Sequence, residues 1–322
     1  MTLRLAAVVG PTGVGKTDLA LSLARALAGE IVSVDSRLLY RGMDIGTAKP
    51  TAAQRAAVPH HLLDVADPDE IWSLGRFRQA VMESVRQIYG RGRLPILVGG
   101  TGQYMTAVLD GWTPPSAPAD PELRREAETF AHEHGPAALH DRLREVDPEA
   151  AARIDPRNLR RVIRGLEVAR ASGGPRRALP RRSAVPFEAV RVGLSLPRSE
   201  LYARLDARLD RMLADGFVEE VRGLMARGCG RHLPSMSAIG YRQLAAYIEG
   251  EMTFEQALAR VRQATHRYVR QQANWFRADD PRIRWFKPGP DYEAEVLAYV
   301  RAALEAPLTP HPSPAERERG QE

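Results

Sequence analysis

The chain has 322 residues, a length that exceeds the usual size of a single hydrophobic core. Hydrophobic residues make up 44% of it, a composition that excludes a disordered protein. The formal net charge of +6 suits an anionic partner such as nucleic acid, but arginine supplies all but three of the 46 basic residues. This charge is therefore a bias of the whole chain and weak evidence by itself. A single cysteine, Cys229, excludes a disulfide framework and a cysteine-based metal site.

The chain begins with a short apolar strand, Leu5–Val9, that runs directly into a glycine-rich segment. An apolar run of this length is too short for a signal peptide or a membrane span. We therefore expect a cytoplasmic protein that makes no contact with a membrane.

Strands and helices alternate in the first third of the chain. The predicted strands are Leu5–Val9, Glu30–Asp35, His61–Asp64 and Leu94–Gly99, and the predicted helices are Asp18–Ala28 and Gly75–Tyr89. This alternation is typical of an α/β fold with a doubly wound parallel sheet.

The pattern changes after Gly111, where polar helical segments run from about Pro121 to Ser172 before a strand returns at Val190–Leu196. We therefore predict a helical insertion domain, residues 112–188, within an α/β core made of residues 1–111 and 189–305. Further predicted elements are helices at Leu201–Arg227, Ser237–Glu249 and Thr253–Arg277 and a last strand at Arg282–Phe286. Residues 306–322 are rich in proline and charge, which predicts a disordered tail.

The glycine-rich segment fits the phosphate-binding loop pattern G-x-x-x-x-G-K-[ST] at every fixed position. Its residues are Gly10, Pro11, Thr12, Gly13, Val14, Gly15, Lys16 and Thr17. The glycines allow the backbone to turn so that successive N–H groups meet phosphate oxygens at a helix N-terminus. Lys16 would add a cation, and the Thr17 hydroxyl would suit Mg²⁺. The sequence therefore predicts a P-loop fold with a phosphate site at this position.

A phosphate-binding loop alone indicates a nucleotide kinase or an NTPase. Such enzymes carry a second acid after a hydrophobic strand, where it helps to hold Mg²⁺. The strand Leu94–Gly99 has no carboxylate at its end, and the candidate acid is instead Asp35, which follows the second strand. Because the carboxyl ends of parallel strands face one crevice, Asp35 should point toward the loop. A turn aspartate that caps the next helix is the alternative interpretation.

Beyond the loop, the chain resembles the bacterial tRNA dimethylallyltransferase (tRNA isopentenyltransferase) family. The segments that carry the resemblance are Gly10–Thr17, Val34–Tyr40, Gly42–Pro50, His60–Asp64, Phe77–Arg78, Leu97–Tyr104, Asp120–Arg124, Asn158–Glu167, Arg204–Arg211, Gly216–Val221 and Ile239–Gln243. They follow one another in the family's order. The run from Asp44 to Pro50 and the Gly-Gly-Thr-x-x-Tyr segment are not general features of phosphate-binding loops, so the resemblance is specific.

The resemblance implies transfer of a dimethylallyl group from dimethylallyl diphosphate to N6 of the adenosine at tRNA position 37. In this interpretation Asp35 accepts the proton of the amine, which is a poor nucleophile. Lys16, Thr17 with Mg²⁺, and Arg208 would stabilise the departing diphosphate, with Arg204 as the alternative arginine. A solvated helix face remains the other interpretation of both arginines.

The resemblance also implies contacts with the anticodon stem-loop of tRNA. Asp35, Ser36, Arg37 and Leu38 would meet a flipped adenine, Thr101 would lie against the nucleotide, and Leu123, Arg160, Arg161, Val162, Ile163 and Arg164 would contact tRNA from the insertion. The three arginines form one helical stripe that suits RNA phosphates, although a solvated face would look the same. A monomer is expected.

The helix ending near Arg277 departs from the family pattern, with His266 and Gln271 where the family commonly has Arg and Asn274 where it has Thr. Its aromatic residues, Tyr268, Trp275 and Phe276, are predicted to lie in the core. Two other functions remain open from the residues: a P-loop kinase of a small metabolite or nucleoside, and a non-enzymatic, RNA-binding ATPase-like switch.

Overall fold

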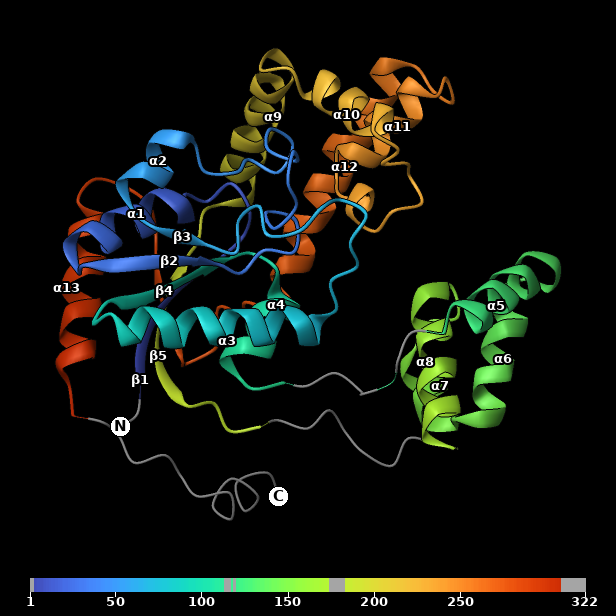
Figure 1. The fold of residues 1–322 in the computed structure, drawn as a ribbon, viewed down its shortest axis with the longest axis horizontal. Helices are drawn as coiled ribbons and strands as arrows, with labels where there is room; N and C mark the ends of the chain where they lie inside the picture. Colours follow the sequence, from blue (N-terminus) through green and yellow to red (C-terminus); the bar gives the residue numbers. More distant parts are fainter. Residues whose placement is uncertain (1–2, 113–116, 118–119, 174–182, 308–322) are drawn as a thin grey trace. The chain divides into compact units, whose positions relative to one another are not determined.

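The apolar strands form one parallel sheet with the order β3-β2-β4-β1-β5-β6 (Figure 1). The strands are β1 (Leu3–Val9), β2 (Gly29–Ser33), β3 (His60–His61), β4 (Leu94–Gly99), β5 (Phe187–Leu194) and β6 (Ile283–Phe286). Ala6 of β1 lies opposite Ile96 of β4 and Val190 of β5, so β1 is central and its carboxyl end lies in the middle of the sheet edge. The predicted doubly wound parallel sheet is confirmed.

The structure is a computed structural model that describes residues 3–112, 117, 120–173 and 183–307. Two units make up the chain: a larger one of residues 1–110 and 184–322, and a smaller one of residues 111–183. Most of the predicted tail, residues 308–322, lies outside the described residues. Within the described residues, no helix has the length and apolar character to cross a membrane.

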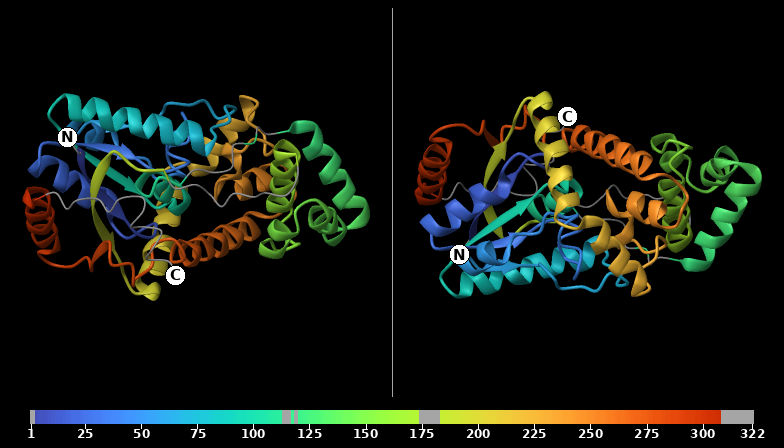
Figure 2. Two further views of the ribbon diagram at one scale, coloured as in Figure 1. Left: turned by 90° about the horizontal axis from the view of Figure 1, so that it is seen from below. Right: turned by 90° about the horizontal axis from the view of Figure 1, so that it is seen from above.

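Side chains point alternately to the two faces along each strand, so an apolar strand presents apolar residues on both faces. Helices cover both faces of this sheet and bury them. Ala6 and Val8 of β1 pack with α1 (Lys16–Ala26) and α13 (Tyr292–Glu305), whereas Leu5, Ala7 and Val9 face the cluster that includes α3 (Leu74–Gly90). Figure 2 shows α3 in teal and α13 in red on opposite sides of the strands. Both faces of the central strand β1 are therefore buried, which explains why its residues from Leu5 to Val9 are all apolar.

A second group of helices lies beyond the carboxyl edge of the sheet (Figure 1). It consists of α9 (Arg198–Ala214), α10 (Phe217–Ala226), the 3-10 turn Ser235–Ser237, α11 (Tyr241–Ile248) and α12 (Phe254–Gln272). The predicted single helix Leu201–Arg227 is wrong, because Gly216 adopts φ 95° and separates α9 from α10. The remaining helices, α2 (Ala52–Ala57) and α4 (Gly102–Leu109), and also α13, were not predicted from the sequence.

The smaller unit is helical. Its elements are α5 (Pro121–His134), α6 (Pro136–Val146), α7 (Pro148–Arg153) and α8 (Leu159–Ser172). Proline at the start of α5, α6 and α7 fits the first helical turn, where its missing N–H is not needed. This unit ends at residue 183, and β5 begins at Phe187 and pairs with Leu3 of β1.

Candidate active site

The phosphate-binding loop connects β1 to α1 at the carboxyl edge of the sheet. Gly10 (φ 140°) and Gly13 (φ 81°) adopt backbone conformations that side chains disfavour. A Cβ at Gly10 would lie 2.5 Å from the carbonyl oxygen of Leu194, and one at Gly13 would lie 2.8 Å from Cδ2 of Leu205. Gly10, a fixed glycine of the sequence pattern, is therefore required by space as well as by backbone conformation, and the backbone conformation of Gly13 likewise disfavours a side chain.

Lys16 opens α1 and points back over the loop, where its Nζ donates to the carbonyl oxygen of Pro11 at 2.7 Å. Removal from water lowers the pKa of Lys16 to about 8, while the nearby Asp35 carboxylate opposes this shift and Arg208 adds to it. The ammonium therefore lies in a site that lacks sufficient negative charge. A bound anion would supply that charge.

Two clefts meet beside the loop. The first, of about 590 Å³, is lined by Lys16, Thr17, Asp18, Leu38, Gly99, Gly100, Arg204, Arg211 and Gln272, among others. The second, of about 450 Å³, has more apolar side chains in its lining, which include Leu205, Leu209, Met212, Phe217 and Val261. Thr12, Asp35, Thr47, Arg208 and Tyr268 line both. These five residues mark the junction of a cationic cleft and a more apolar one.

Asp35 follows β2 and reaches the junction, as its position at a strand end predicts. Its Oδ1 also accepts a hydrogen bond from the backbone N–H of Arg37 at 2.8 Å. The segment after Asp35 is a turn and not a helix, so the helix-capping interpretation is not confirmed; the one carboxylate shapes this turn and also reaches the junction. Its charge acts on Lys16, Arg208 and Tyr268, all of which have pKa values that respond to it.

Arg208 lies on the face of α9 that lines both clefts. Burial lowers the pKa of its guanidinium, with Asp35 opposing the shift and Arg211 adding to it. Arg204, one helical turn earlier, is paired with Glu200 at 2.8 Å and lines only the first cleft. The geometry thus favours Arg208 over Arg204 as the arginine nearest the junction.

Tyr268 and Gln272 of α12 reach the site without having been predicted there. Gln272 is buried, accepts from the N–H of Thr12 at 3.0 Å and donates to the carbonyl oxygen of Gly100 at 2.7 Å. Burial, and then Asp35, raise the pKa of Tyr268 to about 12. Tyr268 and Gln272 lie one helical turn apart near the end of α12, so they share one face of the helix. This spacing was the signal in the sequence that could have indicated their place in the site.

The prediction that the aromatic residues of this helix lie in the core is correct for one of the three. Phe276 is buried in the core. Tyr268 lines both clefts, and Trp275 is 44% exposed. Hydrophobic character alone could not distinguish the buried aromatic residue from the other two. The helical spacing could not do so either, because α12 ends at Gln272 and Trp275 lies beyond it.

The other predicted nucleotide contacts of the larger unit lie around the same junction. Ser36, Arg37 and Thr101 line the second cleft, and Leu38 lines the first. The Arg37 guanidinium donates to the carbonyl oxygen of Pro234 at 2.6 Å and to the Ser237 hydroxyl at 3.0 Å. Arg37 therefore also holds the turn that forms one wall of the second cleft.

The predicted tRNA contacts of the smaller unit differ in their exposure. Arg160 and Arg161 are exposed, and Leu123 is partly exposed. Val162 and Ile163 are buried in the core of this unit, so their side chains pack against helices and do not form surface. Arg164 donates to Glu167 at 2.8 Å and to the carbonyl oxygen of Ala117 at 2.9 Å. Two of the three arginines thus present their charge to solvent, and binding of tRNA by this segment stays a prediction.

A parallel sheet with a phosphate-binding loop after its central strand, facing a cleft that contains a lysine and three arginines, defines a P-loop protein with an anion site. Comparison with known proteins is more specific. The model of the family described as IPP transferase matches residues 38–279. The chain belongs to this family, and it is therefore an enzyme.

Individual relatives cover nearly the whole chain. A protein from Chloroflexus aurantiacus named tRNA dimethylallyltransferase is 52% identical over 273 residues, which are 85% of this chain and 92% of the relative. One of the same name from Roseiflexus sp. is 52% identical over 302 residues, 94% of this chain and 99% of the relative. The crystal structure of the full-length tRNA isopentenylpyrophosphate transferase from Bacillus halodurans has a TM-score of 0.70 and 39% identity, covering 95% of this chain and 97% of that one.

Proposed function

We propose that this chain transfers a dimethylallyl group from dimethylallyl diphosphate to N6 of the adenosine at tRNA position 37, beside the anticodon. One observation carries the proposal: Asp35 and Arg208 line both the cleft of the phosphate-binding loop and the more apolar second cleft. A diphosphate in the first cleft and a flipped adenine in the second would meet at these two side chains. The names of the relatives support the same substrates.

The chemistry follows from the charges at the junction. A bond forms between N6 and the allylic carbon while the bond from that carbon to the diphosphate oxygen breaks. Asp35 accepts the proton that N6 loses. The departing diphosphate keeps the electron pair, and Lys16, Arg208 and the loop amides stabilise its charge. The products are the prenylated adenosine and diphosphate, and the proton leaves through Asp35.

Mg²⁺ is the expected cofactor, and the residues of the first cleft fit it. The Thr17 hydroxyl and the carboxylates of Asp18 and Asp35 line this cleft and are oxygen donors of the kind that Mg²⁺ prefers. Among the described residues, no cluster of three or more His, Cys, Asp or Glu side chains forms a metal site. This donor set suits an ion held mainly by substrate oxygens and water, and the ion would neutralise part of the diphosphate charge.

The tRNA must present the adenine outside the base stack, because an enzyme cannot reach the reacting amine while the base is stacked. Ser36, Arg37 and Thr101 would contact the flipped nucleotide. Arg160 and Arg161 of the smaller unit are exposed and would suit phosphates of the anticodon stem-loop. A cytoplasmic location and a monomeric state remain predictions from the sequence.

The kinase alternative has one feature in its favour, the phosphate-binding loop. It is disfavoured by the end of β4, where Gly99 and Gly100 occupy the position at which a P-loop kinase needs a carboxylate for Mg²⁺. The non-enzymatic RNA switch does not account for an acid placed opposite a lysine and an arginine.

Labelled substrates separate these functions. The purified protein is incubated with unmodified tRNA, Mg²⁺ and either labelled dimethylallyl diphosphate or labelled ATP. We expect label to enter tRNA from the prenyl diphosphate and not from ATP. Incorporation from ATP alone would reject the transferase, and incorporation from neither, with RNA binding retained, would favour the switch.

A further inference from the structure

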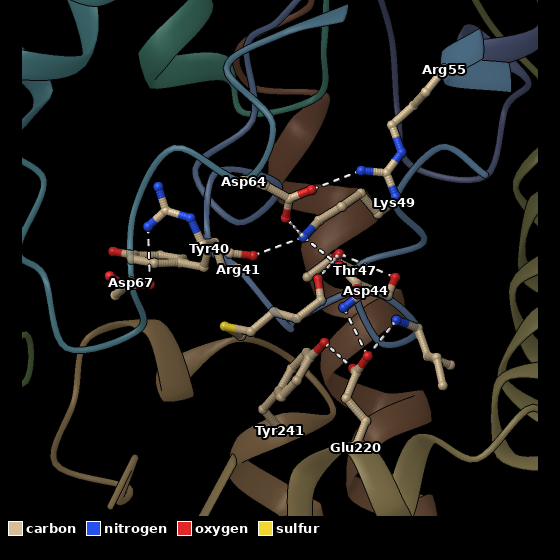
Figure 3. A network of polar contacts seen from close by, with 12 residues as sticks. Tyr40, Arg41, Asp44, Thr47, Lys49, Arg55, Asp64, Asp67, Glu220 and Tyr241 are labelled. Carbon is tan, nitrogen blue, oxygen red and sulfur yellow. Dashed lines mark hydrogen bonds and ion pairs between the residues drawn. The ribbon is translucent and has the colours of Figure 1, made fainter. Parts of the chain in front are cut away.

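A loop without helix or strand, Asp44–Lys49, forms one wall of the site; we refer to it as the anchored loop. Gly46 lines the second cleft, Ala48 lines the first, and Thr47 lines both. The loop is not part of the sheet, so its position depends on what holds it. Contacts from two other elements do so, and they are drawn in Figure 3.

The first anchor is Glu220 of α10, which is about 175 residues away in sequence. Its Oε2 accepts from the backbone N–H groups of Asp44 at 2.8 Å and Ile45 at 2.7 Å, and its Oε1 accepts from that of Gly46 at 3.2 Å. The Tyr241 hydroxyl donates to the same Oε1. One carboxylate thus accepts from three successive amides and a phenol, an arrangement that fixes the backbone and not only a side chain.

The second anchor is Lys49, whose side chain is 1% exposed. Its Nζ donates to Asp44 Oδ1 at 2.5 Å, to Asp64 Oδ1 at 2.6 Å and to the carbonyl oxygen of Tyr40 at 2.7 Å. Asp64 is held in turn by Arg55 at 2.7 Å. Lys49 closes the loop at its far end and ties it to the segment after β3.

Packing leaves the loop little freedom between these anchors. A Cβ at Gly46 would overlap the rings of Phe217 and Tyr241, so the backbone lies directly against α10 and α11. Ala48 adopts φ 52°, a conformation that a residue with a side chain keeps only when its surroundings enforce it. The Ala48 N–H donates to the carbonyl oxygen of Ile45 at 2.9 Å. The loop is therefore a rigid turn held against two helices.

We infer that Glu220 is a positioning residue of the transferase: it acts through the amides of the anchored loop to set the wall at the junction where the two substrates meet. This inference rests on the proposed function for the identity of those substrates. Phe217, on the same helix, also lines the second cleft. Glu220 thus connects the anchored loop, which lines both clefts, to the helix that lines the second cleft.

The test is Glu220→Gln, because glutamine has the same shape but offers one acceptor oxygen and one NH₂ group that cannot accept. The matched control is Glu219→Gln, which makes the same charge change at the neighbouring, exposed position of α10. We expect the glutamine at 220 to lower kcat by ~10–100-fold, because small displacements of a site wall are costly to rate. The KM for tRNA should stay within about twofold of the control. A merely structural residue would lower the melting temperature and leave kcat of the folded fraction unchanged.

The variant Tyr241→Phe distinguishes the contribution of the three backbone amides to kcat from that of the Tyr241 phenol. It keeps the ring against Gly46 and removes one of the four donors to Glu220, so kcat should fall by no more than about threefold. If Tyr241→Phe matched Glu220→Gln in kcat, or if Glu220→Gln matched Glu219→Gln, the inference would be overturned.

Two measurements keep the inference testable if Glu220→Gln does not fold or if the transferase proposal fails. Amide hydrogen exchange on the unaltered protein should show the N–H groups of Asp44, Ile45 and Gly46 protected, and exchange at the rate of an open chain would contradict the anchor. Affinity for inorganic diphosphate requires no transferase activity. It should be about tenfold weaker in Glu220→Gln than in Glu219→Gln, since Thr47 and Ala48 line the cleft of the phosphate-binding loop.

Discussion

At the scale of single residues, Asp35 combines two contacts with different consequences. Its Oδ1 holds the N–H of Arg37 and so shapes the turn after β2, while its charge acts on Lys16 and Arg208 across the junction. An alanine at this position would remove both effects at once. Asparagine separates them, because its side-chain oxygen can still accept from Arg37 but cannot take up a proton.

We therefore expect Asp35→Asn to lower turnover by ~10²–10⁴-fold while tRNA affinity is largely kept. Steady-state kinetics with dimethylallyl diphosphate, together with a filter-binding measurement of tRNA affinity, check this. Near-normal turnover in the asparagine variant would limit Asp35 to shaping the turn.

Lys16 gives a prediction about pH. Its pKa is lowered to about 8 by removal from water, and the protonated form is the one that attracts diphosphate. The attraction is therefore fully present below pH 8 and is lost as the pH rises through 8. We expect kcat/KM for the prenyl diphosphate, which reports the free enzyme, to fall above this pH.

The control for that prediction is Lys16→Arg, which keeps a cation at every pH used. Its kcat/KM is expected to be lower overall, because the compact ammonium fits the loop better, but to lose the decline near pH 8. A decline of the same size in both enzymes would assign the titration to another group.

At the scale of elements, α12 joins parts of the site that come from distant strands. Gln272 holds the N–H of Thr12 after β1 and the carbonyl oxygen of Gly100 after β4. The phosphate-binding loop is therefore braced by a helix that follows it by some 260 residues. Without this brace, the part-buried N–H of Thr12 and the buried carbonyl oxygen of Gly100 would lose their partner, and an unpaired buried group costs about 1–3 kcal/mol.

Gln272→Leu should lower the melting temperature and raise the KM for the prenyl diphosphate about tenfold, since both effects act through the loop. Gln263→Leu on the exposed side of the same helix is the control, and little change is expected there. Thermal unfolding and initial-rate kinetics measure the two effects. A loss of stability with an unchanged KM would show that Gln272 braces the fold without shaping the loop.

At the scale of the whole molecule, the C-terminal end of α13 is held against the central strand of the sheet. Arg4 of β1 donates to the carbonyl oxygens of Leu304 and Ala306, so the C-terminal end of α13 is tied to the central strand. Ala306 itself, the first residue of the predicted tail, is thus an acceptor in the fold. Val296 and Val300 of α13 are fully buried against the sheet.

Ending the chain at Ala306 should leave turnover and melting temperature unchanged, because both carbonyl partners of Arg4 remain. Ending it at Pro290 removes α13 and exposes the sheet face beneath Val296 and Val300, a loss of about 1.5–3 kcal/mol for each buried side chain. Circular dichroism melts of the two truncated chains compare them. A lower melting temperature for the chain ending at Ala306 would show that the removed residues contribute to the fold.

The sequence by itself determined the features that are local in the chain. The pattern from Gly10 to Thr17 specifies a loop whose glycines, lysine and hydroxyl act within eight residues, and the alternation of apolar strands with helices specified the parallel sheet. The position of Asp35 followed from one rule, that the carboxyl ends of parallel strands lie at the same edge of the sheet. The transferase chemistry came from the resemblance to a family and not from spacing or composition.

Tertiary structure alone decided which distant residues complete the site. Gln272, Tyr268 and Glu220 lie in helices far from the loop in sequence, and their roles depend on hydrogen bonds and charges that exist only after the chain has folded. Burial likewise separated Arg160 and Arg161 from Val162 and Ile163 within one predicted contact segment. The physical reason is that local backbone patterns are set by neighbouring residues, whereas burial and long-range hydrogen bonding are set by packing between elements.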